Sequence, residues 1–174
     1  MFAHPDKNVE RLGIEPGMKV ADLGTGSGHY ALAAARLIGV HGRVYAVDVV
    51  KDMLSRLKKE AEQSHLHNID VVWGNAEKLG GTTLRDASVD RVIMSNVLFQ
   101  LEDRAQIGGE VRRILKPGGL ALIIDWTGSF GMMGPHPDRV VADVAAKAIF
   151  EKAGLAYERE FSAGDHHYGL VFKR

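Results

Sequence analysis

Short apolar runs alternate with amphipathic helical patterns along most of this 174-residue chain. Five runs rich in valine and isoleucine are typical of buried parallel strands: residues 19–23, 43–48, 69–73, 90–95 and 120–125. Apolar residues recur at helical spacing between and after them, over residues 29–38, 53–61, 107–115 and 140–149. This alternation predicts a mostly parallel sheet with helices on its faces.

The C-terminal region changes to a period of two. Two alternating runs, 155–161 and 168–172, flank the sequence SAGDHH and predict an antiparallel hairpin. Residues 74–89 are expected to form a loop with at most a short helix, and the sequence KPGG at 116–119 is expected to be a turn. We therefore predict one α/β domain over residues 1–174. Its fold would be Rossmann-like and doubly wound, a mostly parallel seven-stranded sheet with a C-terminal antiparallel hairpin.

Composition narrows the classes of function. The 22 basic and 22 acidic side chains balance, so no net field attracts nucleic acid or an anionic membrane. The chain has no cysteine, which excludes disulfides and thiolate chemistry, and its eight histidines follow no metal-binding pattern. The first residues, MFAHPDKNVERLG, are polar, and no apolar stretch is long enough to span a bilayer. We expect a soluble cytoplasmic protein without bound metal, nucleic acid or stable membrane anchor; the oligomeric state stays open.

The sequence VADLGTGSGHY, residues 20–30, places three alternate glycines between the first strand and the first helix. Ligands of such sheets bind at this position, and glycine lets the backbone approach a ligand closely. The spacing is G-x-G-x-G rather than the G-x-G-x-x-G of dinucleotide-binding proteins. The glycines could also serve only the tight turn.

Two aspartates flank this glycine loop. Asp22 precedes it by two residues and would repel a pyrophosphate but attract an ammonium group. Asp48 ends the second strand, where an acidic residue commonly binds ribose hydroxyls, although it could also cap the following helix. The pattern therefore favours a ligand that joins an amino acid to a nucleoside.

Five segments together resemble the class I S-adenosylmethionine-dependent methyltransferases, and the resemblance covers nearly the whole chain. They are VADLGTGSG, VYAVDVVKDML, GNAEKL at 74–79, VDRVIMSNVLFQLED at 89–103 and LKPGG at 115–119. The nearest branch is the small-molecule one, typified by ubiquinone and menaquinone C-methyltransferases and also called methyltransferase type 11. The terminal hairpin is similar to that of the same family.

The resemblance implies a binding site for S-adenosylmethionine. Asp22 and residues 24–28 would line its methionine part, Asp48 would take the ribose hydroxyls, and Val49 would pack on the adenine. Asn75 stands where the family more often has aspartate, and an amide can still pair with the adenine edge. The cofactor-binding residues so implied are Asp22, Gly24, Thr25, Gly26, Ser27, Gly28, Asp48, Val49, Asn75, Ala76, Ser95 and Asn96.

The methyl-transfer centre is less constrained by the sequence. Ser95 and Asn96 would lie beside the sulfonium by the same resemblance, or could only satisfy backbone groups at a strand end. A base is needed only for some acceptors, and His166 and His167 are candidates because of their loop position near the open end of the sheet.

Contacts to the acceptor are expected from an apolar loop. Phe130, Met132 and Met133 lie in the glycine- and proline-rich loop 126–137 and could line an acceptor pocket, or fold back on the core. Tyr30 could border the same pocket.

The expected function is transfer of a methyl group from S-adenosylmethionine to a small-molecule acceptor by in-line displacement. The sequence SNVLFQ lacks the N-P-P-[YF] motif of the amino-directed members of the family, which argues against a base or glutamine as acceptor. Two alternatives remain: an NAD(P)-binding oxidoreductase, and a non-catalytic S-adenosylmethionine-binding protein.

Overall fold

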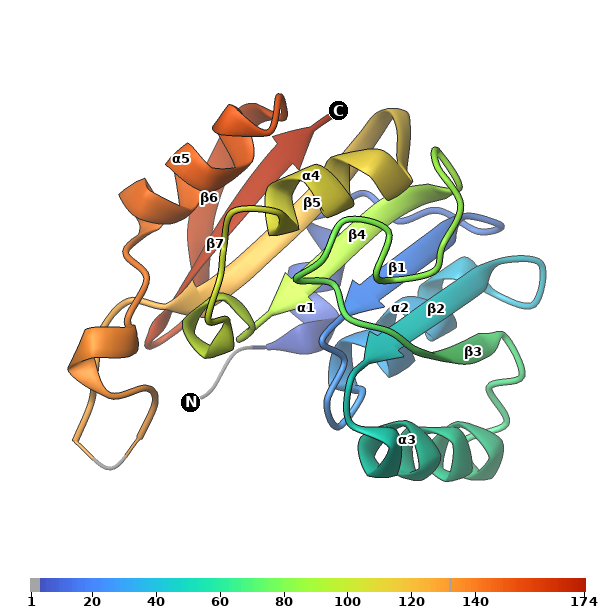
Figure 1. The fold of residues 1–174 in the computed structure, drawn as a ribbon. Coiled ribbons are helices and arrows are strands. Elements are labelled where there is room, and N and C mark those ends of the chain that lie inside the picture. The colour runs from blue at the N-terminus through green and yellow to red at the C-terminus, as the bar shows by residue number, and fades with distance from the viewer. Residues whose placement is uncertain (1–3, 132) are drawn as a thin grey trace.

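A seven-stranded sheet runs through the centre of the computed structural model, which describes residues 4–131 and 133–174 (Figure 1). The strand order is β3-β2-β1-β4-β5-β7-β6. The first five strands are parallel, and β7 is antiparallel to both of its neighbours. The bounds are β1 Lys19–Leu23, β2 Arg43–Asp48, β3 Ile69–Trp73, β4 Val89–Ser95, β5 Leu115–Trp126, β6 Ala156–Gly164 and β7 His167–Lys173. The predicted fold class is confirmed.

Helices cover both faces of this sheet (Figure 1). One apolar core joins the sheet to α1, α2 and α3, and a second core joins the other face to α4 and α5. No helix in the described part of the chain combines the length and apolar character that crossing a bilayer requires. The bounds are α1 Pro5–Glu10, α2 His29–Ile38, α3 Lys51–Gln63, η1 Leu98–Gln100, α4 Ile107–Ile114, η2 Pro137–Arg139 and α5 Asp143–Lys152.

The strand order places a crevice at the centre of the sheet. The chain runs outward from β1 through β2 to β3, then returns to pair β4 with the other edge of β1. The connections after β1 and β4 therefore leave the sheet in opposite directions above their carboxyl ends. Such a switch point is where open α/β sheets bind their ligands.

The apolar face predicted for the last helix is only partly buried; it consists of Val140, Val141, Val144, Ala145, Ala148 and Ile149. Val144 is 71% exposed and Ala145 is also exposed, whereas Ala146 and Phe150 are buried. The cause is the start of the helix: α5 begins at Asp143, so the valines at 140 and 141 precede it and do not share its phase. Counting them into the stripe rotated the predicted face away from the core.

The sequence KPGG is part of a strand rather than a turn before it. β5 begins at Leu115, and its pairing with β4 shifts register between Val89 and Arg91, so that residues 116–119 form a bulge. Gly118 has φ +78°, and its N–H donates to the Arg174 carbonyl at 2.9 Å. The C-terminal residue thus satisfies backbone groups that a turn would have left to solvent.

Gly108 lies inside α4, where glycine is unfavourable by about 1 kcal/mol relative to alanine. A Cβ atom at this position would lie 2.8 Å from the Ala153 Cβ and 3.0 Å from the Ile149 carbonyl oxygen. The missing side chain therefore lets α4 pack closely against α5.

Candidate functional site

The glycine loop after β1 has a backbone that other residues rarely adopt. Gly24, Gly26 and Gly28 have φ values of +68°, +51° and +81°. A Cβ at Gly24 would lie 2.5 Å from Val97, and one at Gly28 would lie 2.2 Å from Leu57. A Cβ at Gly26 would have no neighbour closer than 4.0 Å, so this part of the backbone faces open space. The turn explains the positive φ values, and the open side of Gly26 leaves room for a ligand.

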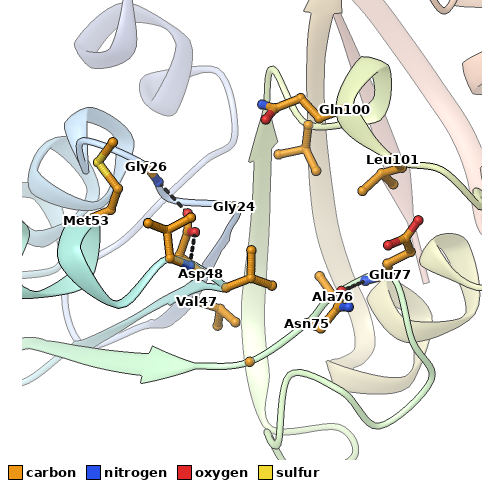
Figure 2. A pocket seen from close by; sticks show the side chains of 14 residues that line it. Gly24, Gly26, Val47, Asp48, Met53, Asn75, Ala76, Glu77, Gln100 and Leu101 are labelled. Atoms are coloured by element: carbon orange, nitrogen blue, oxygen red, sulfur yellow. Dashed lines mark hydrogen bonds between the residues drawn. The ribbon is translucent and has the colours of Figure 1, made fainter. Parts of the chain in front are cut away.

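Two cavities meet at this loop, with Gly24, Gly26 and Gln100 in the walls of both. The first cavity, of about 470 Å³, lies between the loop after β2, the loop after β3 and η1 (Figure 2). Its wall also contains residues 47–50, Met53, residues 74–77, Val97 and Leu101. The second cavity, of about 270 Å³, adjoins it on the side of α2. Its wall also contains Pro5, Asp22, Thr25, Ser27, His29, Tyr30, Ser95, Asn96 and His167.

The structure brings the predicted cofactor residues together around these two cavities. All of them except Gly28 line one cavity or the other. Gly28 is instead the residue at which α2 begins, with Leu57 of α3 packed against it. The first cavity also has Met53, Gln100 and Leu101 in its wall. Sequence reasoning missed all three; Met53 is an apolar residue on a helix, a position that gives no sign of facing a ligand.

Asp48 is held rigidly between the glycine loop and the start of α3 (Figure 2). Its Oδ2 atom accepts a hydrogen bond from the Gly26 N–H at 2.9 Å, and its Oδ1 atom accepts one from the Val50 N–H at 2.9 Å. The second bond shows that Asp48 does serve the turn before α3. Each carboxylate oxygen has a further lone pair, so the same group can also accept from a ligand hydroxyl.

Asp22 is a buried carboxyl group in the wall of the second cavity. It is 2% exposed, and its Oδ2 atom accepts a hydrogen bond from the Thr25 hydroxyl at 2.6 Å. Burial raises the pKa of Asp22 to about 6, and the charge of Asp48 acts in the same direction, although the bond from Thr25 opposes both. A cation placed beside this carboxylate would replace the solvation that burial removes.

The loop after β3 carries the far wall of the first cavity. The Asn75 Oδ1 atom accepts a hydrogen bond from the Glu77 N–H at 2.9 Å, which fixes the side-chain amide in the wall (Figure 2). Further along the loop, Glu110 of α4 accepts hydrogen bonds from the N–H groups of Gly80 and Thr82 at 2.6 and 3.1 Å. Sequence reasoning missed this anchor, although an acidic residue within the apolar stripe of a helix was a signal for it.

Glu110 is ionised in spite of its burial. Burial favours the neutral acid, but hydrogen bonds from Arg113, Thr82 and the Gly80 backbone together lower the pKa of Glu110 below its usual value. The Arg113 guanidinium lies 2.8 Å from the Glu110 carboxylate. A buried, paired charge therefore holds the loop that supplies Asn75.

The second cavity is polar and contains buried groups that are not satisfied internally. The Asn96 Oδ1 atom and both ring nitrogens of His167 make no hydrogen bond to the described residues. Asn96 has φ +59°, an uncommon backbone conformation for a non-glycine residue. Tyr30 accepts a hydrogen bond from the Asn8 side chain at 3.0 Å, and burial raises the pKa of its hydroxyl. Unpaired buried polar groups around one cavity are typical of a ligand site.

The described residues of the apolar loop after β5, 127–131 and 133–137, do not contribute to either cavity. The Phe130 ring packs against the rings of His166 and Trp126, with centroids 4.0 and 6.4 Å apart. Met133 is exposed and pairs with the backbone of Phe130. Phe130, Met133 and His166 are absent from both cavity walls within residues 4–131 and 133–174, and Met132 lies outside the described residues.

The charges around the cavities suit a cationic ligand. Among the residues that the structure describes, neither wall contains lysine or arginine, whereas Asp22, Asp48 and Glu77 contribute carboxyl groups. S-adenosylmethionine carries an ammonium and a sulfonium and fits this set of groups. The pyrophosphate of a dinucleotide would meet three carboxyl groups and no lysine or arginine in the described walls, so the residues present do not fit it.

Comparison with known proteins gives a consistent result. A family model described as "Methyltransferase domain" matches residues 14–162. The demethylmenaquinone methyltransferase of Bacillus mycoides (strain KBAB4) is 29% identical over 87% of this chain and 62% of its own length. That of Geobacillus stearothermophilus is 28% identical over 67% of this chain and 49% of its own length. This chain thus spans about half or somewhat more of the length of these curated relatives. A crystal structure of a SAM dependent methyltransferase from Aquifex aeolicus superimposes with a TM-score of 0.88 at 29% identity, covering 98% of this chain and 89% of that one.

Proposed function

The chain belongs to the methyltransferase domain family, and we propose that it transfers a methyl group from S-adenosylmethionine to a small-molecule acceptor. Its fold is that of the class I S-adenosylmethionine-dependent methyltransferases. One observation carries the proposal: two adjoining cavities meet at Gly26, with a buried carboxyl group beside each and no lysine or arginine in their described walls.

We assign the nucleoside to the first cavity. Asp48 accepts the ribose hydroxyls, because its carboxylate is already oriented by the backbone at Gly26 and Val50. Val49 packs on the adenine from its exposed position in the wall, and Asn75 pairs with the edge of the ring. Ala76 lies beside Asn75 and leaves room for the base.

We assign the amino-acid part to the second cavity. Asp22 lies near the ammonium, and the positive N-terminal end of α2, which begins at His29 in the same wall, favours the carboxylate. Ser95 and Asn96 lie at the end of β4, next to the sulfonium, in the same wall. When bound, the cofactor supplies a methyl group that is intrinsically electrophilic. The chain's own part is to exclude water and to orient the acceptor in line with the reacting bond.

The acceptor is proposed to be a small molecule because the second cavity is small. Its volume of about 270 Å³ must also hold the amino-acid part of the cofactor, which leaves space for one compact group. The two relatives are demethylmenaquinone methyltransferases, which is consistent with a small organic acceptor. We further propose that the protein acts in the cytoplasm, in line with its balanced charge.

Isothermal titration calorimetry of the purified protein tests the cofactor assignment. We expect S-adenosylmethionine and S-adenosylhomocysteine to bind and NAD not to bind, because only NAD brings a pyrophosphate to the carboxyl groups. Replacing Asp48→Asn should weaken S-adenosylmethionine binding about 10- to 100-fold, since a hydrogen bond to a charged group contributes roughly 1.5–3 kcal/mol.

Asp70→Asn is the matched control for this titration. Asp70 is an exposed aspartate on the neighbouring strand β3, outside both cavity walls, so its removal should leave the affinity unchanged. Binding of NAD without binding of S-adenosylmethionine would refute the proposal and support the oxidoreductase alternative. Binding without turnover on any acceptor would support a non-catalytic S-adenosylmethionine-binding protein.

A further inference from the structure

The only β7 residue in the wall of the second cavity is His167, the first residue of that strand. β7 is antiparallel to β5, so its beginning lies at the same edge of the sheet as the ends of β1, β4 and β5. His167 pairs with Trp126 across the two strands, and their rings stack with centroids 4.2 Å apart. The sheet and this stacking hold the imidazole at the cavity in one orientation.

The His167 imidazole is buried without a partner. It is 2% exposed, and neither ring nitrogen makes a hydrogen bond to any described residue. A buried imidazole that served only packing would leave these polar atoms unsatisfied, at a cost of about 1–3 kcal/mol. His166 differs in this respect, because its ring packs on Phe130 outside the cavity.

The protonation state of His167 suits a proton acceptor. Burial lowers the pKa of His167 below that of an ordinary histidine, and the neighbouring His166 acts in the same direction. The titratable groups that share the cavity with it are Asp22, His29 and Tyr30. His167 is therefore neutral at physiological pH and has a ring nitrogen with a free lone pair.

A second feature provides a route by which the proton can leave the His167 imidazole. His167 also lines a third cavity, of about 460 Å³, on its other side. The titratable groups of that cavity are Asp143, Glu160, Asp165 and Tyr168. The ring thus lies in the wall of the proposed reaction site and in that of a polar cavity that can take up a proton.

We propose that His167 is the general base of this site and that the acceptor is an uncharged molecule with a phenolic or enolic hydroxyl group. The proposal rests on the proposed function and adds the substrate class. An anionic acceptor would face the carboxyl group of Asp22 with no lysine or arginine in the described walls to balance its charge. A methylated amine can keep its proton as an ammonium, whereas the ether formed from a hydroxyl cannot, so a base is needed for the hydroxyl.

Atoms and charge are conserved in the proposed methyl transfer. The acceptor oxygen forms a bond to the methyl carbon while the carbon–sulfur bond breaks, and sulfur keeps the electron pair of that bond and loses its positive charge. The hydroxyl proton moves to His167, which becomes an imidazolium. The positive charge is thereby transferred from sulfur to the imidazole, from which the proton leaves to solvent.

Histidine NMR titration of the wild-type protein tests the position of His167 without any acceptor. We expect the His167 pKa to be lower in the complex with S-adenosylmethionine than in that with S-adenosylhomocysteine, by about one unit, because only the former carries a charge on sulfur. The ring signals of His41, exposed before the start of β2 at the opposite edge of the sheet, should have the same chemical shifts in both complexes. Equal His167 pKa values in the two complexes would overturn the proposal.

Methyl transfer to three matched probes, phenol, thiophenol and aniline, tests the chemistry. We expect the wild-type protein to methylate phenol, and His167→Gln to lower that rate about 10²- to 10⁴-fold, the usual contribution of a general base. The loss should shrink as pH rises, since phenol then ionises unaided. His166→Gln is the matched control and should keep the wild-type rate.

The failures of the two proposals are distinguishable. Calorimetry on each variant shows whether S-adenosylmethionine still binds, and absence of binding to the wild-type protein contradicts the proposed function itself. Binding combined with no methylation of phenol overturns the hydroxyl acceptor, and full phenol turnover by His167→Gln overturns the base.

Discussion

The buried carboxyl group of Asp22 makes cofactor binding dependent on pH. In the free protein its pKa is raised to about 6, mainly by burial, and an ammonium ligand requires the ionised form. We expect the affinity for S-adenosylmethionine to fall about tenfold for each pH unit below 6 and to be constant between pH 6.5 and 7.5. Calorimetry between pH 5 and 7.5 measures this dependence. An affinity that does not change over this range would show that Asp22 does not face the ammonium.

The same residue should limit the stability of the free protein. Because its folded-state pKa exceeds the unfolded value of about 3.9, stability falls as pH rises from about 4 to 6, and the loss is complete above that range. The shift corresponds to a cost on the order of 3 kcal/mol at neutral pH. We expect Asp22→Asn to raise the free energy of unfolding at pH 7.5 by about 1–3 kcal/mol while it abolishes tight cofactor binding.

Urea denaturation at several pH values checks this expectation. The difference between Asp22→Asn and wild type should vanish near pH 4, where the carboxyl group is protonated. Asp70→Asn, at an exposed position, should stay within about 0.5 kcal/mol of wild type. If Asp22→Asn is less stable than wild type at pH 7.5, the expected gain in the free energy of unfolding is contradicted.

Several residues of the candidate site could be predicted because a polar side chain lies at or near the end of an apolar run, where a parallel strand ends. Asp22 and Asp48 each sit at the end of an apolar run, and both lie at a cavity. His166 and His167 could not be distinguished, because only the pairing of β7 with β5 decides which of two neighbours faces inward. Glu110 supports the site through a loop about thirty positions away, a contact that no local pattern records.

At the level of elements, the close contact between α4 and α5 gives two adjacent glycines opposite roles. A Cβ at Gly108 would meet Ala153 at 2.8 Å, whereas one at Gly109 would meet nothing closer than Leu79 at 3.7 Å. We expect Gly108→Ala to destabilise the protein by about 1–3 kcal/mol through overpacking. Gly109→Ala should instead stabilise it by about 0.5–1 kcal/mol through helix propensity and reduced chain entropy.

Denaturation of the two variants side by side measures both effects. Each variant controls for the other, because they differ only in which face of α4 receives the methyl group. Equal effects of the same sign would show that the α4–α5 contact is not as close as the structure has it.

The helices and strands could be predicted where burial determines the spacing of apolar residues in the sequence. β1, β2, β4 and the later part of β5 are largely buried, so each appears as an apolar run, whereas β3 lies at the edge of the sheet and contains no buried residue. α5 is covered on one side only, and its face could not be assigned until its first residue, Asp143, was known. The bulge at residues 116–119 depends on hydrogen bonds to Arg174, which lies at the far end of the chain.

At the scale of the whole molecule, Asn8 links the N-terminal helix to the last hairpin. Its side-chain amide donates to the Tyr30 hydroxyl at 3.0 Å and to the Ala163 carbonyl at 2.9 Å. Asn8→Ala removes this donor from the Tyr30 hydroxyl and leaves the Ala163 carbonyl with only the bond from the His4 N–H at 3.4 Å, so we expect a loss of about 1–3 kcal/mol in the free energy of unfolding. The melting temperature should fall by roughly 2–4 °C for each kcal/mol, which circular dichroism can follow.

Lys7→Ala provides the control for this variant. Lys7 is exposed on the same short helix, so its removal should change stability by less than about 0.5 kcal/mol. A melting temperature of Asn8→Ala equal to that of Lys7→Ala would mean that these two hydrogen bonds of Asn8 do not stabilise the contact of α1 with α2 and the C-terminal hairpin.

The residues that line the two cavities occupy different parts of the sequence, so the ribosome completes the two sets at different times. Every residue in the wall of the first cavity has been translated once Leu101 is added, whereas the second cavity waits for His167. At about 5–20 residues per second, the ribosome needs several more seconds to supply that residue. A nascent chain thus carries the complete residue set of its nucleoside pocket before it contains the imidazole to which we assign the proton transfer.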